Sequence, residues 1–525
     1  MYKNFLLFVI LLMISCTVHD NKEQRTTVPE RGAMERANDK LIDLDETNDE
    51  VAIKDIYAKS VSQFGITWTF DKKYQIGQFA NGDNWVVGPV NIISINPPSI
   101  EINGTTTVKG FTPGSGPGAK IRIMNGAMIN PSPKKGALQG YDNEMYRWVP
   151  QKGQRLYDGN YDSSLNVALN VSKANPLTVS PGSSLVSTIS LEKGYRPQPK
   201  TAAILTVLAS PAPKGSFRPP YSGSDKTVKF NQNALKYNLL KKLAKVSSTP
   251  ELSSVERYLE RPWLDHVPNW VGRYSHPVEN MPDYGREMSI QIGEAALMLH
   301  LDLTNEQKET LLIRYVQLGI DLFGIIKDGG KDNWLPAGGQ TQGRKWPIMF
   351  AGFMLDDAEM KNIGKKSGDY LYSNGHGLDN FPPDYIQFNE DGQTFYVSQD
   401  EVERTRSEKW KPDHRNVKKG ETLRYEPSDI GMPEWGIHHT KAPFQDNKHW
   451  DALYRRCCTA NSYGGFVLAA LIMGLRSEWN HNALFDYMDR YMSIEEKGQW
   501  TRQRPKFVED MWDKYRDDYP PVWEK

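Results

Sequence analysis

The chain has few cysteines, few histidines and no excess of charge of either sign. Its 525 residues include three cysteines and ten histidines. Cys16 stands alone near the start, whereas Cys457 and Cys458 are neighbours, so no further cysteine exists to complete a zinc site. A disulfide between adjacent cysteines closes a strained ring. We therefore expect Cys457 and Cys458 to be two buried thiols at the start of a helix.

The balance of charge argues against nucleic acid as a partner. Lys and Arg together number 64, and Asp and Glu together also number 64. A protein without a global basic field has little long-range attraction for nucleic acid. A polyanionic substrate stays compatible with this balance if the cations that hold it are gathered locally. Aromatic residues make up 11% of the chain, which fits sugar binding and also fits ordinary core packing.

An apolar run at the N-terminus has the features of an export signal. Lys3 precedes residues 5–14, FLLFVILLMI, which are too few to span a bilayer comfortably. The sequence MISC at 13–16 resembles a bacterial lipobox, in which the cysteine carries the lipid. We expect residues 1–16 to be a lipoprotein signal peptide, with Cys16 anchoring the protein to the outer membrane, on its periplasmic or its outer face. The alternative is a simple secretory signal with a chance cysteine.

Composition changes along the chain predict a tether and two domains. Residues 17–52 are polar and charged, which is typical of a disordered tether. Residues 53–225 contain short alternating runs, such as GITWTF at 65–70, separated by Gly, Pro and Asn clusters, and this pattern predicts an antiparallel β-sandwich. The remaining residues, 226–525, have the period of helices. A chain of this length is too long for one compact core.

The second domain is expected to be an (α/α)-toroid, that is, an incomplete α/α barrel. Its clearest helix is 305–327, which Thr304 and Gln307 begin with a capping box. Pairs of helices with small residues at their contacts resemble successive layers of such a toroid, the small residues being Gly319, Gly324, Gly464, Gly465 and Gly474. Residues 364–450 are mostly irregular, and so long an irregular stretch is usually functional. We expect it to form one wall of a cleft.

Residues 333–349, NWLPAGGQTQGRKWPIM, combine aromatic, amide and cationic side chains between two predicted helices. Aromatic rings stack on the apolar face of a sugar, amides bond its hydroxyls, and Arg grips a carboxylate with two parallel hydrogen bonds. Loops carry function more often than the elements that they join. We therefore expect this stretch to bind an acidic sugar through Trp334, Gln340, Gln342, Arg344 and Lys345. The alternative is an ordinary helix connection with a structural Arg.

Three further clusters lie at predicted helix ends or in loops. They supply more binding candidates, namely Asn269, Arg273, Arg286, His439 and Arg455, and candidates for proton transfer, namely His276, Tyr284, His438 and Tyr454. His438 and His439 are adjacent, so a strand would direct at most one of them into a cleft. A divalent metal on these histidines and His449 is an alternative, but no HExxH or comparable spacing is present. We expect no cofactor.

These residue types match β-elimination of a uronate polysaccharide. That reaction needs a neutralised C6 carboxylate, a base that removes the C5 proton, and an acid that protonates the leaving oxygen. Asn269, Gln342 and Arg344 suit the first task. A Tyr acts as base only when cations lower its pKa, and Arg286 and Arg455 lie close in sequence to Tyr284 and Tyr454.

With its lipobox, its β-rich part and its helical part bearing Tyr, His, Arg and Asn clusters, the chain resembles secreted bacterial polysaccharide lyases with an (α/α)-toroid domain. Alginate and glucuronan lyases are the nearest in style. The resemblance implies an endo-acting lyase on an acidic polysaccharide such as alginate, glucuronan or ulvan. The helical alginate lyase signature Asn-Asn-His-Ser-Tyr-Trp is absent, and the stretch from Asn269 to His276 has its Asn and His at a different spacing.

Two other functions fit the sequence. A glycoside hydrolase needs two carboxylates across a cleft, and the candidates are Asp265, Asp283, Glu287, Glu434 and Asp451. A surface lipoprotein that binds glycans without cleaving them would also suit the tether and the aromatic content. Ultraviolet absorbance of an unsaturated product separates a lyase from both alternatives.

Overall fold

The computed structural model describes Ile56 to Glu524 except for several internal segments, which are residues 104–120, 136–137, 144, 146, 149–156, 159–160, 192–198, 269–275, 281–284, 337, 369–381, 408–424, 437–452 and 503–504. Ile56–Lys525 forms one compact unit. The predicted signal peptide with Cys16 and the predicted tether lie outside the described residues. Within the part of the chain that is described, no helix is both long enough and apolar enough to cross a membrane.

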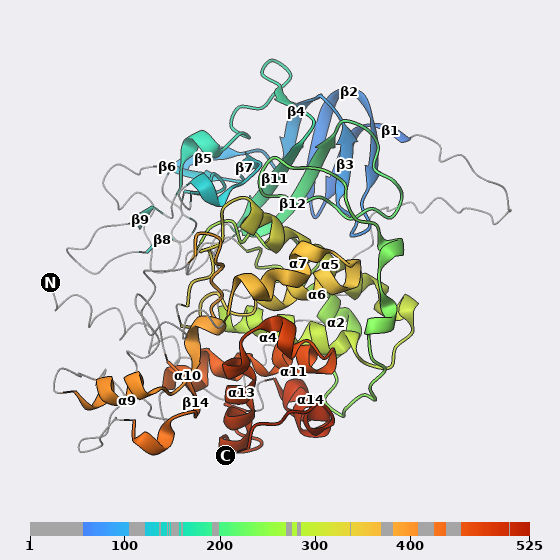
Figure 1. The fold of residues 1–525 in the computed structure, drawn as a ribbon. Helices are drawn as coiled ribbons and strands as arrows, with labels where there is room; N and C mark the ends of the chain where they lie inside the picture. Colours follow the sequence, from blue (N-terminus) through green and yellow to red (C-terminus); the bar gives the residue numbers. More distant parts are fainter. Residues whose placement is uncertain are drawn as a thin grey trace. The chain divides into compact units, whose positions relative to one another are not determined.

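A mixed sheet dominates the N-terminal part of this unit (Figure 1). Its described strands are β1 (Ile56–Gln63), β2 (Ile66–Gln78), β3 (Asn84–Val87), β4 (Val90–Asn96), β7 (Ala127–Ile129), β10 (Leu177–Val179), β11 (Ser183–Ser190) and β12 (Pro199–Leu208). They follow the order β10-β4-β2-β3-β12-β11-β7, and β1 pairs with β2. Separate two-stranded ladders join β5 (Ile100–Asn103) to β6 (Ile121–Met124) and β8 (Arg147–Trp148) to β9 (Tyr157–Asp158).

The predicted β-rich N-terminal part is therefore confirmed, but its pairing is not purely antiparallel. Strand β12 runs parallel to β3, with Thr206 opposite Trp85. The other described pairings of the sheet are antiparallel. Strands β3 and β12 are far apart in sequence, so the long crossover that a parallel pair requires is available. Alternating residues locate the strands well, yet they carry no information about the direction of the partner.

Strand β12 connects two hydrophobic cores. Ala203, Leu205 and Val207 belong to a core that the sheet forms by itself. Ala202 and Ile204 belong to the largest core, most of which is helical. Successive side chains of a strand point to opposite faces of the sheet, so β12 is buried on both faces. This burial explains why its sequence, PKTAAILTVL, is apolar over most of its length and lacks the alternation of a half-exposed strand.

The C-terminal part is helical, as predicted. The described α-helices are α2 (Leu252–Arg257), α4 (Gly285–Leu299), α5 (Asn305–Lys327), α6 (Lys345–Leu355), α7 (Ala358–Lys361), α9 (Gln399–Arg406), α10 (Leu453–Cys458), α11 (Gly464–Ile472), α12 (Arg476–Trp479), α13 (Asn482–Ile494) and α14 (Lys506–Tyr515). A short ladder joins β13 (Thr394–Tyr396) to β14 (Pro433–Trp435). Helix α5 has the predicted bounds, and both hydrogen bonds of the Thr304–Gln307 capping box are present.

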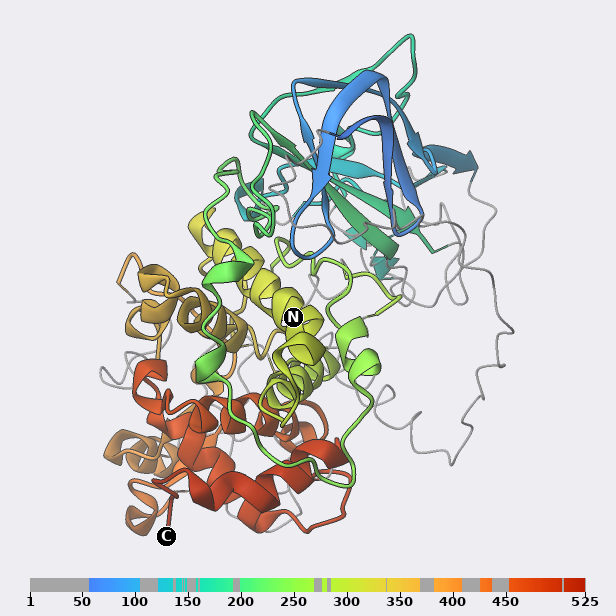
Figure 2. The same cartoon turned by 90° about the vertical axis from the view of Figure 1, so that its right-hand side faces the viewer.

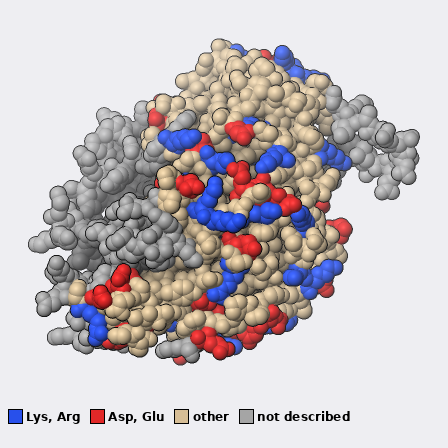
Figure 3. Space-filling view, viewed as in Figure 1, with Lys and Arg blue, Asp and Glu red and all other residues tan. Residues whose placement is uncertain are grey.

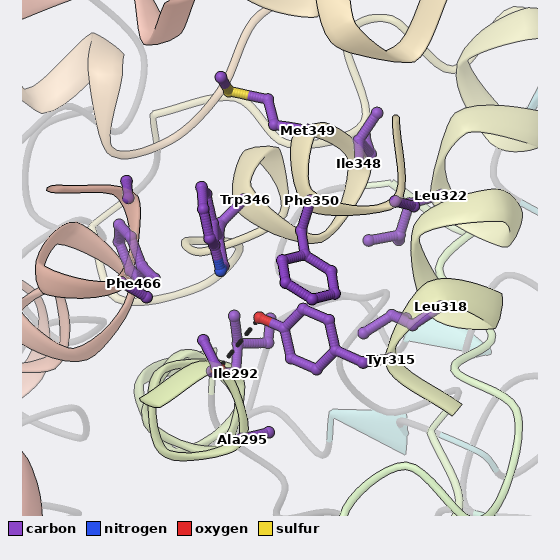
Figure 4. Close-up of a cluster of buried hydrophobic side chains, with 14 of the residues drawn as sticks. Ile292, Ala295, Tyr315, Leu318, Leu322, Trp346, Ile348, Met349, Phe350 and Phe466 are labelled. Atoms are coloured by element: carbon purple, nitrogen blue, oxygen red, sulfur yellow. Dashed lines mark hydrogen bonds between the residues drawn. The ribbon is translucent and has the colours of Figure 1, made fainter. Parts of the chain in front are cut away.

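Aromatic and aliphatic side chains from α4, α5, α6 and α11 fill the centre of the helical part (Figure 4). The Tyr315 ring packs edge-on against Phe350, with 5.1 Å between centroids. Its hydroxyl donates to the carbonyl of Ile292 on α4 at 3.0 Å. That bond gives the Tyr315 hydroxyl a partner inside the core. The side chain can therefore be buried without leaving a polar group unpaired.

Glycines set the closest helix contacts. A Cβ on Gly465 of α11 would lie 2.7 Å from the Cα of Gly293 on α4, and a Cβ on Gly319 of α5 would lie 2.2 Å from the Pro347 carbonyl oxygen of α6. For Gly319 and Gly465, these contacts confirm the prediction that small residues lie where paired helices touch. Gly474 differs, because it has open space around it and a positive φ of 71°, which places it in a turn after α11.

Arg218 links the sheet to the helices. Its Nε donates to Asp83, just before β3, at 2.6 Å, and its Nη1 donates to Asp321 of α5 at 2.9 Å. All three side chains are buried.

The chain that follows Arg218 runs along the outer side of the helices (Figure 2). There the backbone N–H of Lys236 donates to the Met354 carbonyl, and that of Leu243 donates to the His300 carbonyl.

Candidate functional site

The stretch that connects α5 to α6 is buried. Trp334, Gln340, Gln342, Arg344 and Lys345, which the sequence suggested as an accessible sugar-binding set, are each at most 6% exposed. Trp334 stacks on Phe388, with 5.9 Å between the ring centroids and 9° between the planes. One face of the Trp334 ring is therefore occupied by another side chain of this protein.

Asp265 joins Arg344 to His276 in a buried cluster. Arg344 Nε lies 2.8 Å from Asp265 Oδ2, and His276 Nε2 lies 3.0 Å from Asp265 Oδ1. The guanidinium of Arg344 also donates to the Gln342 carbonyl at 2.9 Å. The carboxylate that Arg344 grips is thus one from its own chain. Trp263 covers the cluster, because its ring meets the His276 ring edge-on and lies 5.4 Å from the Arg344 guanidinium.

The charges of this cluster are set by burial and by the ion pair. Burial lowers the pKa of His276, although the neighbouring Asp265 opposes that shift, so the imidazole is neutral at pH 7. Burial by itself would raise the pKa of Asp265, but Arg344 and His276 hold that pKa well below its usual range. An ionised Asp265 accepts a hydrogen bond from Nε2–H, which leaves the lone pair on Nδ1. Nδ1 has no hydrogen-bond partner among the residues that the structure describes.

Gln342 connects this cluster to the start of α11. Its Nε2 donates to the Cys458 carbonyl at 3.2 Å and approaches Ser462 Oγ at 3.4 Å. Its Oε1 is buried and has no partner in the described part of the chain.

Cys457 and Cys458 are joined by a disulfide, which corrects the expectation of two thiols. The prediction rested on ring strain alone, and the structure places both cysteines at the end of a short helix.

Helix α4 begins against the same stretch. A Cβ on Gly285 would lie 2.0 Å from the Gln340 carbonyl oxygen, so only glycine permits this contact. The next residue, Arg286, donates to the Cys457 carbonyl and pairs with Glu287. Segments that are widely separated in sequence therefore meet here: the residues after α2, the start of α4, the α5–α6 connection and the chain before α11.

Two acidic residues that the sequence analysis did not select lie next to Arg344 and Lys345. Lys345 Nζ lies 2.6 Å from Asp391 Oδ2, and Trp479 Nε1 donates to the other oxygen of Asp391 at 2.7 Å. Glu390 Oε2 accepts from Gly343 N at 2.9 Å, while its Oε1 has no partner among the described residues. Burial and the adjacent Asp391 raise the pKa of Glu390 to about 7. The sequence held a clue to Glu390 and Asp391, because both lie in the irregular stretch 364–450, which was expected to form one wall of a cleft.

Arg455 is held by another buried carboxylate, that of Glu434. Its Nη2 lies 3.0 Å from Glu434 Oε1, and the two side chains are fully buried. Arg490 Nη1 lies 3.5 Å from the other oxygen of Glu434. Of the five carboxylates considered for hydrolysis, Asp265, Glu287 and Glu434 therefore each pair with an arginine of this protein. Asp283 and Asp451 lie outside the described residues.

The remaining candidates lie outside the described residues. They are Asn269, Arg273, Tyr284, His438 and His439, and for Tyr454 the helix is described but the side chain is not. Tyr284 directly precedes Gly285 in sequence, and Tyr454 directly precedes Arg455. Where side chains are placed, no group of three or more His, Cys, Asp or Glu residues has the arrangement that would hold a metal ion.

Comparison with known proteins places the chain in no family. No family model, no curated protein and no solved structure matches it.

Proposed function

We propose that this protein is a polysaccharide lyase that cleaves an acidic, uronate-containing polysaccharide by β-elimination, with His276 as the base. One observation carries the proposal. His276 is neutral, Asp265 binds its Nε2 at 3.0 Å, and its Nδ1 has a lone pair without a partner in the described residues. A general base needs a neutral form, a fixed orientation and an unoccupied basic atom, and His276 has all three.

In the proposed reaction, Nδ1 of His276 takes the C5 proton of a uronate. The electron pair of the C5–H bond forms the C4–C5 double bond, the C4–O bond breaks, and the leaving oxygen is protonated by a tyrosine. Tyr284 and Tyr454 are the candidates for that acid, since each directly precedes a residue that packs into the buried region. His276 is fully buried, so the substrate must displace the chain that covers it.

The binding roles are revised accordingly. Arg344 is a positioning residue, because its guanidinium holds Asp265, which in turn orients the base. Lys345 is occupied by Asp391 and Arg455 by Glu434. Gln342, whose Oε1 has no partner within the described chain, is the member of the original set best suited to bond a sugar hydroxyl. Neutralisation of the substrate carboxylate is assigned to Asn269, Arg273, His438 and His439.

The proposal includes the finer fold and the location of the protein. The helical part would be an incomplete (α/α)-toroid following a β-sandwich, and the close packing of α4, α5, α6 and α11 supports that arrangement. Lipidation of Cys16 would anchor the enzyme to the outer membrane, close to a polysaccharide outside the cell. No cofactor takes part in this mechanism.

The test is incubation of the signal-free protein with alginate, glucuronan and ulvan, with ultraviolet absorbance and reducing ends followed together. Both signals should rise on one substrate. His276→Gln should abolish turnover, whereas His300→Gln should not. His300 is a matched control, because it is also fully buried, it has a pKa that burial lowers, and it accepts from Lys241 N outside the site. Equal turnover in the wild type and in His276→Gln, with the same folded spectrum, would refute the proposal.

A glycoside hydrolase is the second candidate function. The raised pKa of the buried Glu390 carboxyl is the observation that favours it. A carboxyl whose pKa is about 7 is protonated in about half of the molecules at neutral pH, so it can act as a general acid there. Hydrolysis also needs a second carboxylate at roughly 5–9.5 Å. In this case reducing ends would appear without ultraviolet absorbance, and Glu390→Gln would abolish them. A reaction that produces the absorbance excludes the hydrolase.

A further inference from the structure

A cavity of about 410 Å³ lies between the loop 217–230 and helices α5 and α7. This volume is within the range of about 300–1,000 Å³ that is typical of small-molecule sites. None of the residues that line the cavity belongs to the Asp265, His276 and Arg344 cluster. We propose that this cavity is a binding site for a neutral sugar unit, separate from the candidate catalytic site. The inference does not depend on the lyase proposal.

Aromatic rings and prolines form the apolar part of the wall. Phe230 and Phe323 line the cavity and are half-buried, so part of each ring is accessible. Pro219 and Pro220 continue this surface at the base of the loop. The C–H faces of a pyranose ring pack on such surfaces, and stacking on an aromatic ring adds stabilisation beyond the area that is buried. The wall therefore suits a flat ligand that has an apolar face.

The polar part of the wall offers hydroxyls and charges of both signs. Ser222, Ser224 and Thr227 supply hydroxyls. The wall also contains charged residues, which are three lysines (Lys134, Lys229 and Lys327) and three acids (Asp225, Asp328 and Glu359). Arg218 lines the cavity as well, but its guanidinium is paired with the buried carboxylates of Asp83 and Asp321. Figure 3 shows basic and acidic side chains interleaved on the face of the molecule that it presents.

Each of the three lysines is paired with a carboxylate. Lys327 lies 2.8 Å from Glu359, and Lys134 lies 3.5 Å from Asp328, while Lys229 pairs with Asp357. With three positive and three negative groups, the wall gives no net attraction to a polyanion. Carboxylates and ammonium groups both bond hydroxyls, so a wall of this kind selects a ligand with many hydroxyls and no charge. That is the chemistry of a neutral sugar.

The loop that forms the wall is held in one conformation by Lys226. Its buried Nζ donates to the carbonyl oxygens of residues 220–223, at distances of 2.6, 3.2, 3.1 and 2.7 Å. Ser222 Oγ donates to Asp328 at 3.0 Å, which ties the loop to the end of α5. Pro220 packs directly on that helix because residue 324 is a glycine. A Cβ on Gly324 would lie 2.1 Å from the Cβ of Pro220. A preformed wall lowers the entropic cost of binding.

The test is affinity electrophoresis of the signal-free protein through gels that contain neutral polysaccharides, namely xylan, mannan, galactan and β-glucan, with alginate for comparison. We expect one neutral polysaccharide to slow the protein more than alginate does. Isothermal titration with its oligosaccharides should give a dissociation constant that Phe323→Ala raises about tenfold or more. Trp500→Ala is the matched control, because Trp500 is an exposed aromatic residue outside the cavity, and its loss should change nothing.

Phe323→Ala also removes packing from α5, so a second variant is needed. Lys327→Gln changes an exposed member of the wall and should weaken the same binding without altering the folded spectrum. The His276→Gln protein should bind the neutral oligosaccharide as the wild type does, which separates this site from the catalytic proposal. Two results would overturn the inference: no neutral glycan slows the protein, or both wall variants bind as tightly as the wild type.

Discussion

His276 Nε2 lies 3.0 Å from Asp265 Oδ1 in a site where both side chains are fully or almost fully buried. The same carboxylate receives Arg344 at 2.8 Å. One acidic residue thus fixes the tautomer of a histidine and neutralises an arginine that comes from a different part of the chain. The pair orients the imidazole, and burial keeps it neutral; together these two effects are the basis of the proposed activity.

Asp265→Asn should destabilise the protein by about 3–5 kcal/mol, because it leaves the buried Arg344 charge without a counter-ion. Urea unfolding followed by tryptophan fluorescence measures this change. Asp356→Asn is the control, since Asp356 pairs with Lys236 and Lys361 at the surface and its loss should leave the urea midpoint unchanged. An Asp265→Asn protein as stable as the wild type would show that the buried pair does not form.

Arg218→Met should also cost about 3–5 kcal/mol in the free energy of unfolding, because Asp83 and Asp321 would both stay buried without a cation. Thermal unfolding is the measurement. Lys327→Met removes a lysine whose partner, Glu359, is exposed, and it should leave the melting temperature unchanged. Similar melting temperatures for the two variants would mean that Arg218 does not join the sheet to α5.

Gly465→Ala should destabilise the protein by about 1–3 kcal/mol, because the new methyl group would meet the backbone of Gly293, which cannot move aside without separating α11 from α4. The adjacent glycine provides the control. In Gly464→Ala the methyl group would meet the end of the Val508 side chain at 3.3 Å, and the better helix propensity of alanine offsets that contact. Chemical denaturation of both variants tests the packing, and equal effects would contradict it.

Glu390 makes stability depend on pH. Its pKa rises from about 4.5 to about 7 in the folded protein, because burial and Asp391 disfavour the charged form. The folded state therefore holds this proton more tightly, so the contribution is complete below a pH of about 4.5 and is lost as the pH rises through about 7. The size of that contribution is about 3 kcal/mol.

Glu390→Gln should remove this loss between acidic and neutral pH, as unfolding free energies measured at several pH values would reveal. Glu294 has a pKa of about 7 for the same reason, burial, and contributes with the same sign. Comparing the wild type with the Glu390→Gln variant isolates the first residue, and Glu294→Gln isolates the second. Parallel pH profiles for the wild type and Glu390→Gln would show that Glu390 titrates normally.

Local patterns in the sequence were enough to locate helix α5 and the change from a β-rich part to a helical part. The 3.6-residue period and the Thr304–Gln307 box predicted the bounds of α5, and small residues predicted the contacts at Gly319 and Gly465. The order of a β-rich part before a helical part was also readable. These features depend on neighbouring residues within a few positions, which is why a single sequence contains them.

The partners of the charged residues were decided by the tertiary structure alone. Arg344 and Lys345 have the same chemistry whether a substrate or the protein supplies the carboxylate, so the sequence suggested a sugar where the fold places Asp265 and Asp391. Asp265 is 79 positions from Arg344, and Asp391 is 46 positions from Lys345. The parallel pairing of β12 with β3 is likewise a long-range choice. Burial then makes such pairs obligatory, because a charge removed from water needs a counter-ion, and only the folded chain determines which residue provides it.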